Sequence, residues 1–321
     1  MNILVYGYYG PDKRNAGDML FTEAFKKLFP EYTFTFTDII TKANLDKVHA
    51  VFIGGGSMLD GIPSIDADAI DTLRSTPLFY IGVGADTDIH DQHNALMKIA
   101  KLICIRTPKD IDKVRAINPN VMAAPDLTYS LAGEVIGRHI AKTVLIVPNC
   151  NLLPRHSSRL WEKIRWDLFK NEISQALDVL VERDYTVRFY GMDQSATMMD
   201  EWAAQEIINS MENRNSNYII RNYYGSKSLM ELFRSFEFVI TSRYHGVMLS
   251  ELTGTPYISI AHHSKLMGAG YRAGCFLSTA EASKDRLLKG VETLHTQAKA
   301  DIQPSDFAEL RRRVKDILEP A

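Results

Sequence analysis

Short apolar runs alternate with longer amphipathic segments along the chain of 321 residues. A short apolar run bounded by turn residues predicts a buried strand, and apolar positions that recur every three or four residues predict a helix. In the first part of the chain the strand-like runs are 2–6, 33–36, 50–53, 78–83 and 102–105. Helical patterns follow at 18–29, 66–74, 92–100 and 108–117. This alternation predicts a parallel sheet covered by helices.

The pattern restarts near Thr143, after a less regular stretch at 125–142. The later strand-like runs are 143–148, 186–190, 217–221, 237–241 and 256–260, and 160–183 is helical. We therefore predict two Rossmann-like α/β domains, residues 1–142 and 143–321, which face each other across a cleft. The chain length also favours two domains of about 150 residues. The last helix, 304–318, is charged and amphipathic, and the sequence leaves open whether it crosses back onto the first domain.

Composition and charge exclude several classes of protein. The net charge of −2 gives no basic footprint for nucleic acid. The three cysteines are far apart and form no CxxC pair, which argues against a disulfide framework and a structural zinc site. The N-terminus lacks the pattern of a secretory signal, and no apolar run approaches the roughly 20 residues of a membrane span. We expect a cytoplasmic protein whose membrane contact, if any, is peripheral.

Ligands of open α/β sheets bind at the carboxyl ends of the strands, so the loops after strands carry the candidate chemistry. Asn15 and Asp18 lie just before a helix, where they either cap it or contact a sugar. Gly54, Gly55 and Gly56, with Ser57, follow the run 50–53. They form either a tight turn or a nest of open backbone N–H groups that binds a ligand.

The next two strand ends carry a further glycine and an arginine. Gly84 repeats the glycine-rich pattern after the run 78–83. Arg106 directly follows the run 102–105, where it is either a solvated surface residue or a bidentate anion clamp. Asp126, in the segment PDL, is typical of a turn followed by a helix cap, and we favour that structural interpretation over a ligand contact.

The most informative segment is 238–265, which contains SRYHG at 242–246. The pattern predicts a strand that ends at Thr241, then a helix that His245 opens and Gly254 ends as a C-cap. A helix N-terminus favours anions, and a histidine there is suited to acid–base chemistry near neutral pH. Arg243 and Lys265 share the same predicted edge. A metal site from His245 and the histidines at 262–263 is disfavoured, since carboxylates at fitting spacing are missing.

In order and spacing, these motifs resemble those of the polysaccharide pyruvyl transferase family. The matching segments are NAGD at 15–18, GGGS at 54–57, IGVGA at 81–85, IR at 105–106, PDL at 125–127, SRYHG at 242–246, and GTPYISI at 254–260 followed by Lys265. One departure concerns Arg106: the family usually has an acidic residue next and a serine soon after, whereas this chain has Thr107 and Pro108.

The resemblance implies two Rossmann-like domains of the GT-B type, with the acceptor on the first and the donor on the second. It implies a transferase that moves a pyruvyl group from phosphoenolpyruvate to a hexose of a glycan, with no cofactor and no metal. The three basic functional residues would be Arg106, His245 and Lys265, with Arg243 close by. Whether the acceptor is lipid-linked stays open. The alternatives are a GT-B glycosyltransferase that uses a nucleotide sugar and a non-catalytic sugar-binding protein of the same fold.

Overall fold

The computed structural model describes residues 1–10, 15–84, 88–133, 139–153, 160–195, 199–214, 218–221, 225–261, 266, 275–294 and 304–320. The chain divides into two compact units. Unit 1 comprises Met1–Lys13, Asp18–Ala132 and Ile302–Ala321, and unit 2 comprises Arg14–Gly17 and Gly133–Asp301. Both units are α/β, and each contains one parallel sheet of six strands.

The sheet of unit 1 has the order β2-β1-β3-β4-β5-β6. Its strands are β1 (Asn2–Tyr6), β2 (Thr33–Thr37), β3 (Ala50–Ser57), β4 (Leu78–Gly84), β5 (Leu102–Ile105) and β6 (Val121–Ala123). The helices are α1 (Ala16–Leu28), α2 (Lys42–Leu45), α3 (Ile70–Ser75), α4 (Asp91–Ile99), α5 (Ile111–Arg115) and α12 (Ala308–Leu318). Strands β4 and β5 are buried along their whole length, as expected for a parallel sheet with helices on both faces.

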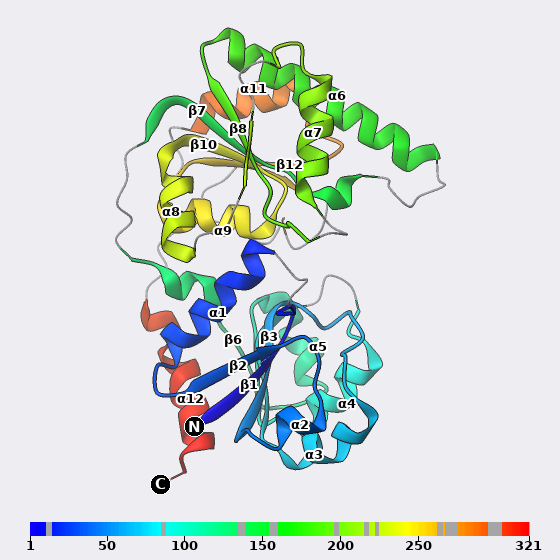
Figure 1. The fold of residues 1–321 in the computed structure, drawn as a ribbon, viewed down its shortest axis with the longest axis vertical. Coiled ribbons are helices and arrows are strands. Elements are labelled where there is room, and N and C mark those ends of the chain that lie inside the picture. Colours follow the sequence, from blue (N-terminus) through cyan, green and yellow to red (C-terminus); the bar gives the residue numbers. More distant parts are fainter. Residues whose placement is uncertain are drawn as a thin grey trace. The chain divides into compact units, whose positions relative to one another are not determined.

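The last helix, α12, packs on unit 1 (Figure 1). It contacts β5, and its apolar face buries Leu310 and Val314 completely, next to the buried Phe307. Arg311 adds an ion pair of 3.9 Å with Glu31. Unit 1 is therefore assembled from two stretches of chain that are far apart in the sequence.

The glycines after the predicted run 50–53 do not form a separate loop. Strand β3 continues through them to Ser57, and Gly54 pairs with Ile81 while Ser57 pairs with Gly84 of β4. A β-carbon at Gly54 would lie 2.9 Å from the carbonyl carbon of Ile81, so close packing of two strands requires glycine there. Gly55 and Gly56 have φ of +78° and +109°, a backbone conformation that favours glycine.

The sheet of unit 2 has the order β12-β11-β10-β7-β8-β9. Its strands are β7 (Ile140–Val147), β8 (Thr186–Tyr190), β9 (Tyr218–Ile220), β10 (Phe236–Thr241), β11 (Tyr257–Ala261) and β12 (Cys275–Ser278). Counted within the unit, this is the order 6-5-4-1-2-3, the Rossmann arrangement read from the other edge. The order reverses between β7 and β10, which makes their carboxyl ends the topological switch point.

The helices of unit 2 cover the two faces of its sheet (Figure 1). They are α6 (Leu160–Glu182), α7 (Asp200–Ser210), α8 (Ser226–Ser235), α9 (Tyr244–Thr253) and α11 (Lys284–Thr293). Helices α6, α7 and α11 pack one core with the strands, while α8 and α9 contact each other and β10. Gly254 ends α9 in the left-handed conformation, with φ of +65°, which confirms the predicted C-cap. Among the described helices, none is long and apolar enough to cross a bilayer.

Candidate functional site

The loops after β7 and β10 are joined at the switch point of unit 2. The backbone N–H of Ser242 donates to the carbonyl of Val147 at 3.0 Å, which extends the pairing of the two strands by one residue. The side chain of Asn149 donates to the carbonyl of Ser242 at 3.4 Å. The start of α9 is thereby fixed against the short helical turn Cys150–Leu152 that follows β7.

Arg243 is the N-cap residue of α9 and has an extended backbone conformation. Its backbone N–H donates to Oγ1 of Thr241 at 3.1 Å. Gly246 lies in the first turn of the helix, where an added β-carbon would come within 3.0 Å of the Thr241 β-carbon. The SRYHG segment therefore needs its glycine so that the first turn of α9 can pack against the end of β10.

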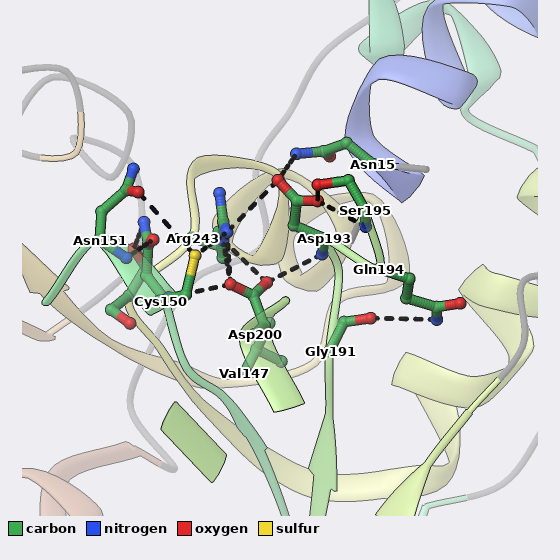
Figure 2. Close-up of polar contacts among 12 residues, drawn as sticks. Asn15, Val147, Cys150, Asn151, Gly191, Asp193, Gln194, Ser195, Asp200 and Arg243 are labelled. Atoms are coloured by element: carbon green, nitrogen blue, oxygen red, sulfur yellow. Dashed lines mark hydrogen bonds and ion pairs between the residues drawn. The ribbon is translucent and has the colours of Figure 1, made fainter. Parts of the chain in front are cut away.

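The guanidinium of Arg243 is held by a fully buried carboxylate (Figure 2). Nε of Arg243 donates to Asp200 Oδ2 at 2.9 Å and to Oδ1 at 3.2 Å, and Nη2 also donates to Oδ1. Nη2 lies 3.6 Å from Sγ of Cys150. Asp200 is the first residue of α7, and its carboxylate also accepts backbone N–H bonds from Cys150 and Asp193, each at 2.9 Å. The arginine is thus held in one orientation by a carboxylate that is itself fixed.

Asp193 supplies a second carboxylate to this cluster (Figure 2). Its Oδ2 lies 3.8 Å from Nη2 of Arg243. Its Oδ1 accepts bonds from the backbone N–H and the hydroxyl of Ser195, at 3.0 and 2.7 Å. The side chain of Asn15 donates to Oδ2 at 3.3 Å, while its own Oδ1 accepts from the Gly17 backbone at 2.9 Å. Asn15 therefore both caps the start of α1 and contacts the acidic cluster.

The electrostatics of this cluster keep Arg243 charged. Burial lowers the pKa of Arg243, but Asp200 more than offsets it, so the pKa is raised above its ordinary value. Burial raises the pKa of the Asp200 carboxyl, against the opposing effect of Arg243 and the two backbone N–H groups. Burial and the carboxylate of Asp200 raise the pKa of the Cys150 thiol to about 12. The thiol is therefore protonated at neutral pH and unsuited to be a nucleophile.

His245 is the second residue of α9, and its ring packs against the turn at Gly17. A β-carbon added at Gly17 would lie 2.6 Å from Cγ and 2.8 Å from Cε1 of the imidazole, well inside van der Waals contact. The ring also contacts Tyr244 edge-on, with 5.4 Å between centroids. Gly17 of the NAGD segment and His245 of the SRYHG segment, more than 200 residues apart in sequence, therefore meet within unit 2.

Arg106 has its own partners in unit 1. Nη1 donates to Asp126 Oδ2 at 2.8 Å, and Nη2 donates to the Ser57 hydroxyl at 2.6 Å. The Arg106 and Asp126 side chains are only 4 % and 1 % exposed, so this is a buried ion pair. Asp126 also caps the helical turn Leu127–Leu131 by accepting from the Thr128 N–H at 3.0 Å. A β-carbon at Gly84 would lie 3.2 Å from Nε of Arg106.

The glycine-rich end of β3 lies beside Tyr9 in unit 1. The Tyr9 hydroxyl donates to the Gly54 carbonyl at 2.8 Å. Burial, followed by the negative charges of Asp18 and Asp126, raises the pKa of Tyr9 well above its usual value. Within unit 1 the fold thus gathers Ser57, Gly84 and Arg106 at the carboxyl edge of the sheet.

Lys265 and the histidines at 262–263 lie outside the described residues. Among the residues that the structure does describe, no three histidine, cysteine, aspartate or glutamate side chains gather as a metal site would require.

Sequence reasoning missed Asp193 and Asp200, the two carboxylates of the Arg243 cluster. Asp193 follows β8, at the same edge of the sheet as Arg243, so its position after a strand is a signal that could have found it. Asp200 begins α7, and its sequence position does not indicate that its side chain points to Arg243.

Two solved structures with a similar fold both contain UDP. MnaA from S. aureus, solved with UDP, is similar over 100% of this chain and 97% of its own, with a TM-score of 0.63 and 11% identity. A UDP-N-acetylglucosamine 2-epimerase from Methanocaldococcus jannaschii, in complex with UDP-GlcNAc and UDP, matches with a TM-score of 0.59 and 9% identity over 98% of this chain and 99% of its own. At such identities the likeness shows the fold alone, two Rossmann-like units of the GT-B type.

The comparison of the sequence with protein families identifies the family and not only the fold. No curated protein is significantly similar to this chain. The sequence model of the polysaccharide pyruvyl transferase family matches residues 15–264, a span that begins at the Asn15 segment and includes Arg106, Arg243 and His245. This span covers well over half of the 321 residues. The chain therefore belongs to the polysaccharide pyruvyl transferase family.

Proposed function

We propose that this protein transfers a pyruvyl group from phosphoenolpyruvate to two hydroxyls of a hexose in a glycan and so forms a pyruvate ketal. Unit 2 binds the donor, and unit 1 binds the sugar of the acceptor that is modified. The observation that carries the proposal is the placement of Arg243 at the N-cap of α9 and of His245 in its first turn, at the switch point of a Rossmann-type sheet, in a chain of this family.

The donor is an anion with a carboxylate and a phosphate, and the start of α9 suits it. The helix N-terminus carries a partial positive charge and backbone N–H groups that stabilise anions. Asp200 and Asp193 engage Nε and Nη2 of Arg243, and among the described residues none accepts a bond from Nη1. We therefore assign Nη1 to the hydrogen bond with the phosphoenolpyruvate anion. Lys265 supplies a second cation in this proposal.

The reaction requires a proton at the methylene carbon of phosphoenolpyruvate and two new C–O bonds at its central carbon. His245 donates the proton as an imidazolium, which turns the methylene into a methyl group. The first sugar hydroxyl attacks the central carbon, and its proton reprotonates the histidine. The second hydroxyl then attacks while the bond to the phosphate oxygen breaks, and its proton leaves with inorganic phosphate. Arg243 neutralises charge on the departing phosphate.

The acceptor side rests on the unit 1 cluster and the NAGD segment. We assign acceptor contacts to Asn15, Asp18 and Ser57, and to the glycines Gly54, Gly55, Gly56 and Gly84. Arg106, in its buried pair with Asp126, holds the Ser57 hydroxyl and so orients the carboxyl edge of β3. In this proposal the protein acts in the cytoplasm without a cofactor or metal, and it meets a membrane only through a lipid-linked acceptor.

The test is incubation with phosphoenolpyruvate and a panel of galactosides, glucosides and N-acetylmannosaminides, with mass spectrometry of the products and assay of inorganic phosphate. We expect one pyruvate ketal per phosphate released, with or without a chelator. An acceptor-independent release of phosphate, or no ketal on any acceptor, contradicts the proposal.

A nucleotide-sugar glycosyltransferase is the main alternative, favoured by the fold of the UDP-bound relatives. Such an enzyme would use an acidic residue of unit 2 to hold the ribose. Asp193 and Asp200, the two carboxylates beside Arg243, instead engage its guanidinium. Thermal-shift titrations separate the two functions: stabilisation by UDP or GDP but not by phosphoenolpyruvate would favour the glycosyltransferase.

A further inference from the structure

Unit 2 contains a cavity that the proposed chemistry does not use. It has a volume of about 700 Å³, within the range of roughly 300–1,000 Å³ that is common for ligand sites. The first half of α6, the turn Cys150–Leu152 and the segment 279–283 after β12 form its walls. All of these segments belong to unit 2.

The cavity begins where the candidate site ends. Within the turn Cys150–Leu152, the Cys150 backbone donates to Asp200 beside Arg243, and the next residue, Asn151, already lines the cavity. A ligand that extends from the start of α9 along this edge of unit 2 would therefore reach the cavity next.

The lining combines aromatic faces with polar groups. Trp166 and Phe169 are buried and pack together at 5.9 Å between ring centroids, whereas Trp161 is 64% exposed. Arg165 and Glu172 are held in place: Arg165 donates to the Thr279 hydroxyl at 3.3 Å, and the Glu172 carboxylate accepts from a backbone N–H at 2.6 Å. Exposed indole rings with nearby fixed polar groups suit ligands that have both apolar faces and hydroxyls.

The negative charge of the lining disfavours anionic ligands. Glu162 and Glu172 oppose Arg165, so the charged side chains of the lining sum to about −1. A nucleotide diphosphate or an anionic lipid headgroup would meet net repulsion there. A neutral sugar ring, whose C–H face stacks on indole while its hydroxyls bond to carboxylates and amides, fits both the shape and the charge.

We propose that this cavity is a glycan-binding subsite that holds sugar residues of the acceptor chain beyond the one that is modified. The inference rests on the proposed function for the identity of the polymer, because a polysaccharide substrate extends past its reacting residue. Trp161 provides the stacking platform, and Arg165, Glu172 and Asn151 bind hydroxyls.

The chain offers a clean probe, because all three of its tryptophans, Trp161, Trp166 and Trp202, lie in unit 2. Tryptophan fluorescence is titrated, without phosphoenolpyruvate, with hexasaccharides of galactose, glucose and N-acetylmannosamine and with the matching methyl monosaccharides. We expect at least one hexasaccharide to bind, and Trp161→Ala to weaken it about tenfold, as loss of one aromatic platform predicts. Trp202→Ala, which removes a 39% exposed tryptophan from outside the cavity, should bind normally.

A second arm tests a membrane contact instead. Leu160, Ile164 and Leu168 form an exposed apolar row on the same helix, with 70%, 40% and 60% exposure. Membrane binding through this row is measured by sedimentation with vesicles of phosphatidylcholine and phosphatidylglycerol, for the wild type, Trp161→Ala and Ile164→Ser. Ile164 does not line the cavity, so Ile164→Ser changes the apolar row without changing the subsite. Vesicle binding that both substitutions abolish, with no change in hexasaccharide affinity, would overturn the glycan subsite in favour of a lipid surface.

Failure of the subsite and failure of the proposed function give different results. If Trp161→Ala leaves hexasaccharide binding unchanged, or if no hexasaccharide binds, the subsite is refuted whether or not pyruvyl transfer occurs. If the hexasaccharide binds through Trp161 but no ketal forms, the subsite stands and the proposed reaction is wrong. If both stand, Trp161→Ala should raise KM for the hexasaccharide about tenfold and leave KM for the methyl glycoside unchanged.

Discussion

Replacing Gly17 by alanine should displace the imidazole of His245 without unfolding the protein. The added β-carbon would lie 2.6 Å from Cγ of the ring, and carbon atoms in ordinary contact stay about 3.5–4.0 Å apart. Nδ1 of the ring would lie closer still, so the ring must retreat by at least about 1 Å. Gly17 has no positive φ and lies in α1, so the backbone itself accepts alanine.

A displacement of about 1 Å at a reacting group can cost a factor of about 10² in rate. We therefore expect Gly17→Ala to lower kcat for ketal formation about a hundredfold, which corresponds to about 2.7 kcal/mol of barrier. The affinity for phosphoenolpyruvate should change much less, because Arg243 is anchored by Asp200 and not by the imidazole. Alanine is also the better helix former, so the melting temperature should stay near that of the wild type.

The assay measures ketal formation and phosphate release at saturating donor, with calorimetry for the donor and a thermal melt for folding. Gly61→Ala is the matched control, since a β-carbon there would meet its nearest atoms at 3.6 and 3.7 Å, an ordinary contact. Normal turnover in Gly17→Ala would refute the assigned role of His245 or its placement against this turn. Equal losses of turnover in both variants would show that the effect is not specific to the histidine.

Three other outcomes follow from the same cluster. His245→Ala should reduce turnover by about 10²–10⁴, the usual loss for a general acid, with a smaller change in donor affinity measured by calorimetry; near-normal turnover would contradict the role. Asp200→Asn should destabilise unit 2 by about 3–5 kcal/mol in urea unfolding followed by tryptophan fluorescence, because it leaves the buried guanidinium uncompensated, whereas the exposed Asp167→Asn should cost less than about 1 kcal/mol. Because the pKa of Cys150 is about 12, peptide mapping after iodoacetamide treatment at pH 8 should find this thiol alkylated only in denatured protein; rapid labelling of the native protein would contradict its burial.

The parts of the fold that could be predicted are those with a strong local pattern. The runs 2–6 and 102–105 appear unchanged as β1 and β5, because a parallel strand buried on both faces is a continuous apolar run. The short edge strands β6 and β12 were not predicted, since three or four residues at an edge carry too little periodicity. The glycines at the end of β3 predict a loop, because glycine is rare in strands. They lie in the strand because β3 and β4 pack too closely there for a side chain.

In the candidate site, some positions could likewise be predicted from the sequence and others could not. The positions of Arg106 in unit 1 and of Arg243 and His245 in unit 2 could be predicted, because the carboxyl ends of parallel strands lie at one edge of their own sheet. Their partners could not: Asp126 and Asp200 lie 20 and 43 residues from the arginines that they bind. Such pairing depends on how loops close in three dimensions, and no periodic signal in a single sequence records it.

The return of α12 to unit 1 has a consequence for how the protein folds as it is made. Phe307, Leu310 and Val314 are almost completely buried in unit 1, so that unit lacks part of its core until the ribosome has released residues 304–318. Unit 2 is encoded nearly whole by Gly133–Asp301 and has emerged by then. Domains usually fold in the order of their synthesis. In this chain the second unit can finish first, and the first unit waits with an open apolar surface that chaperones would recognise.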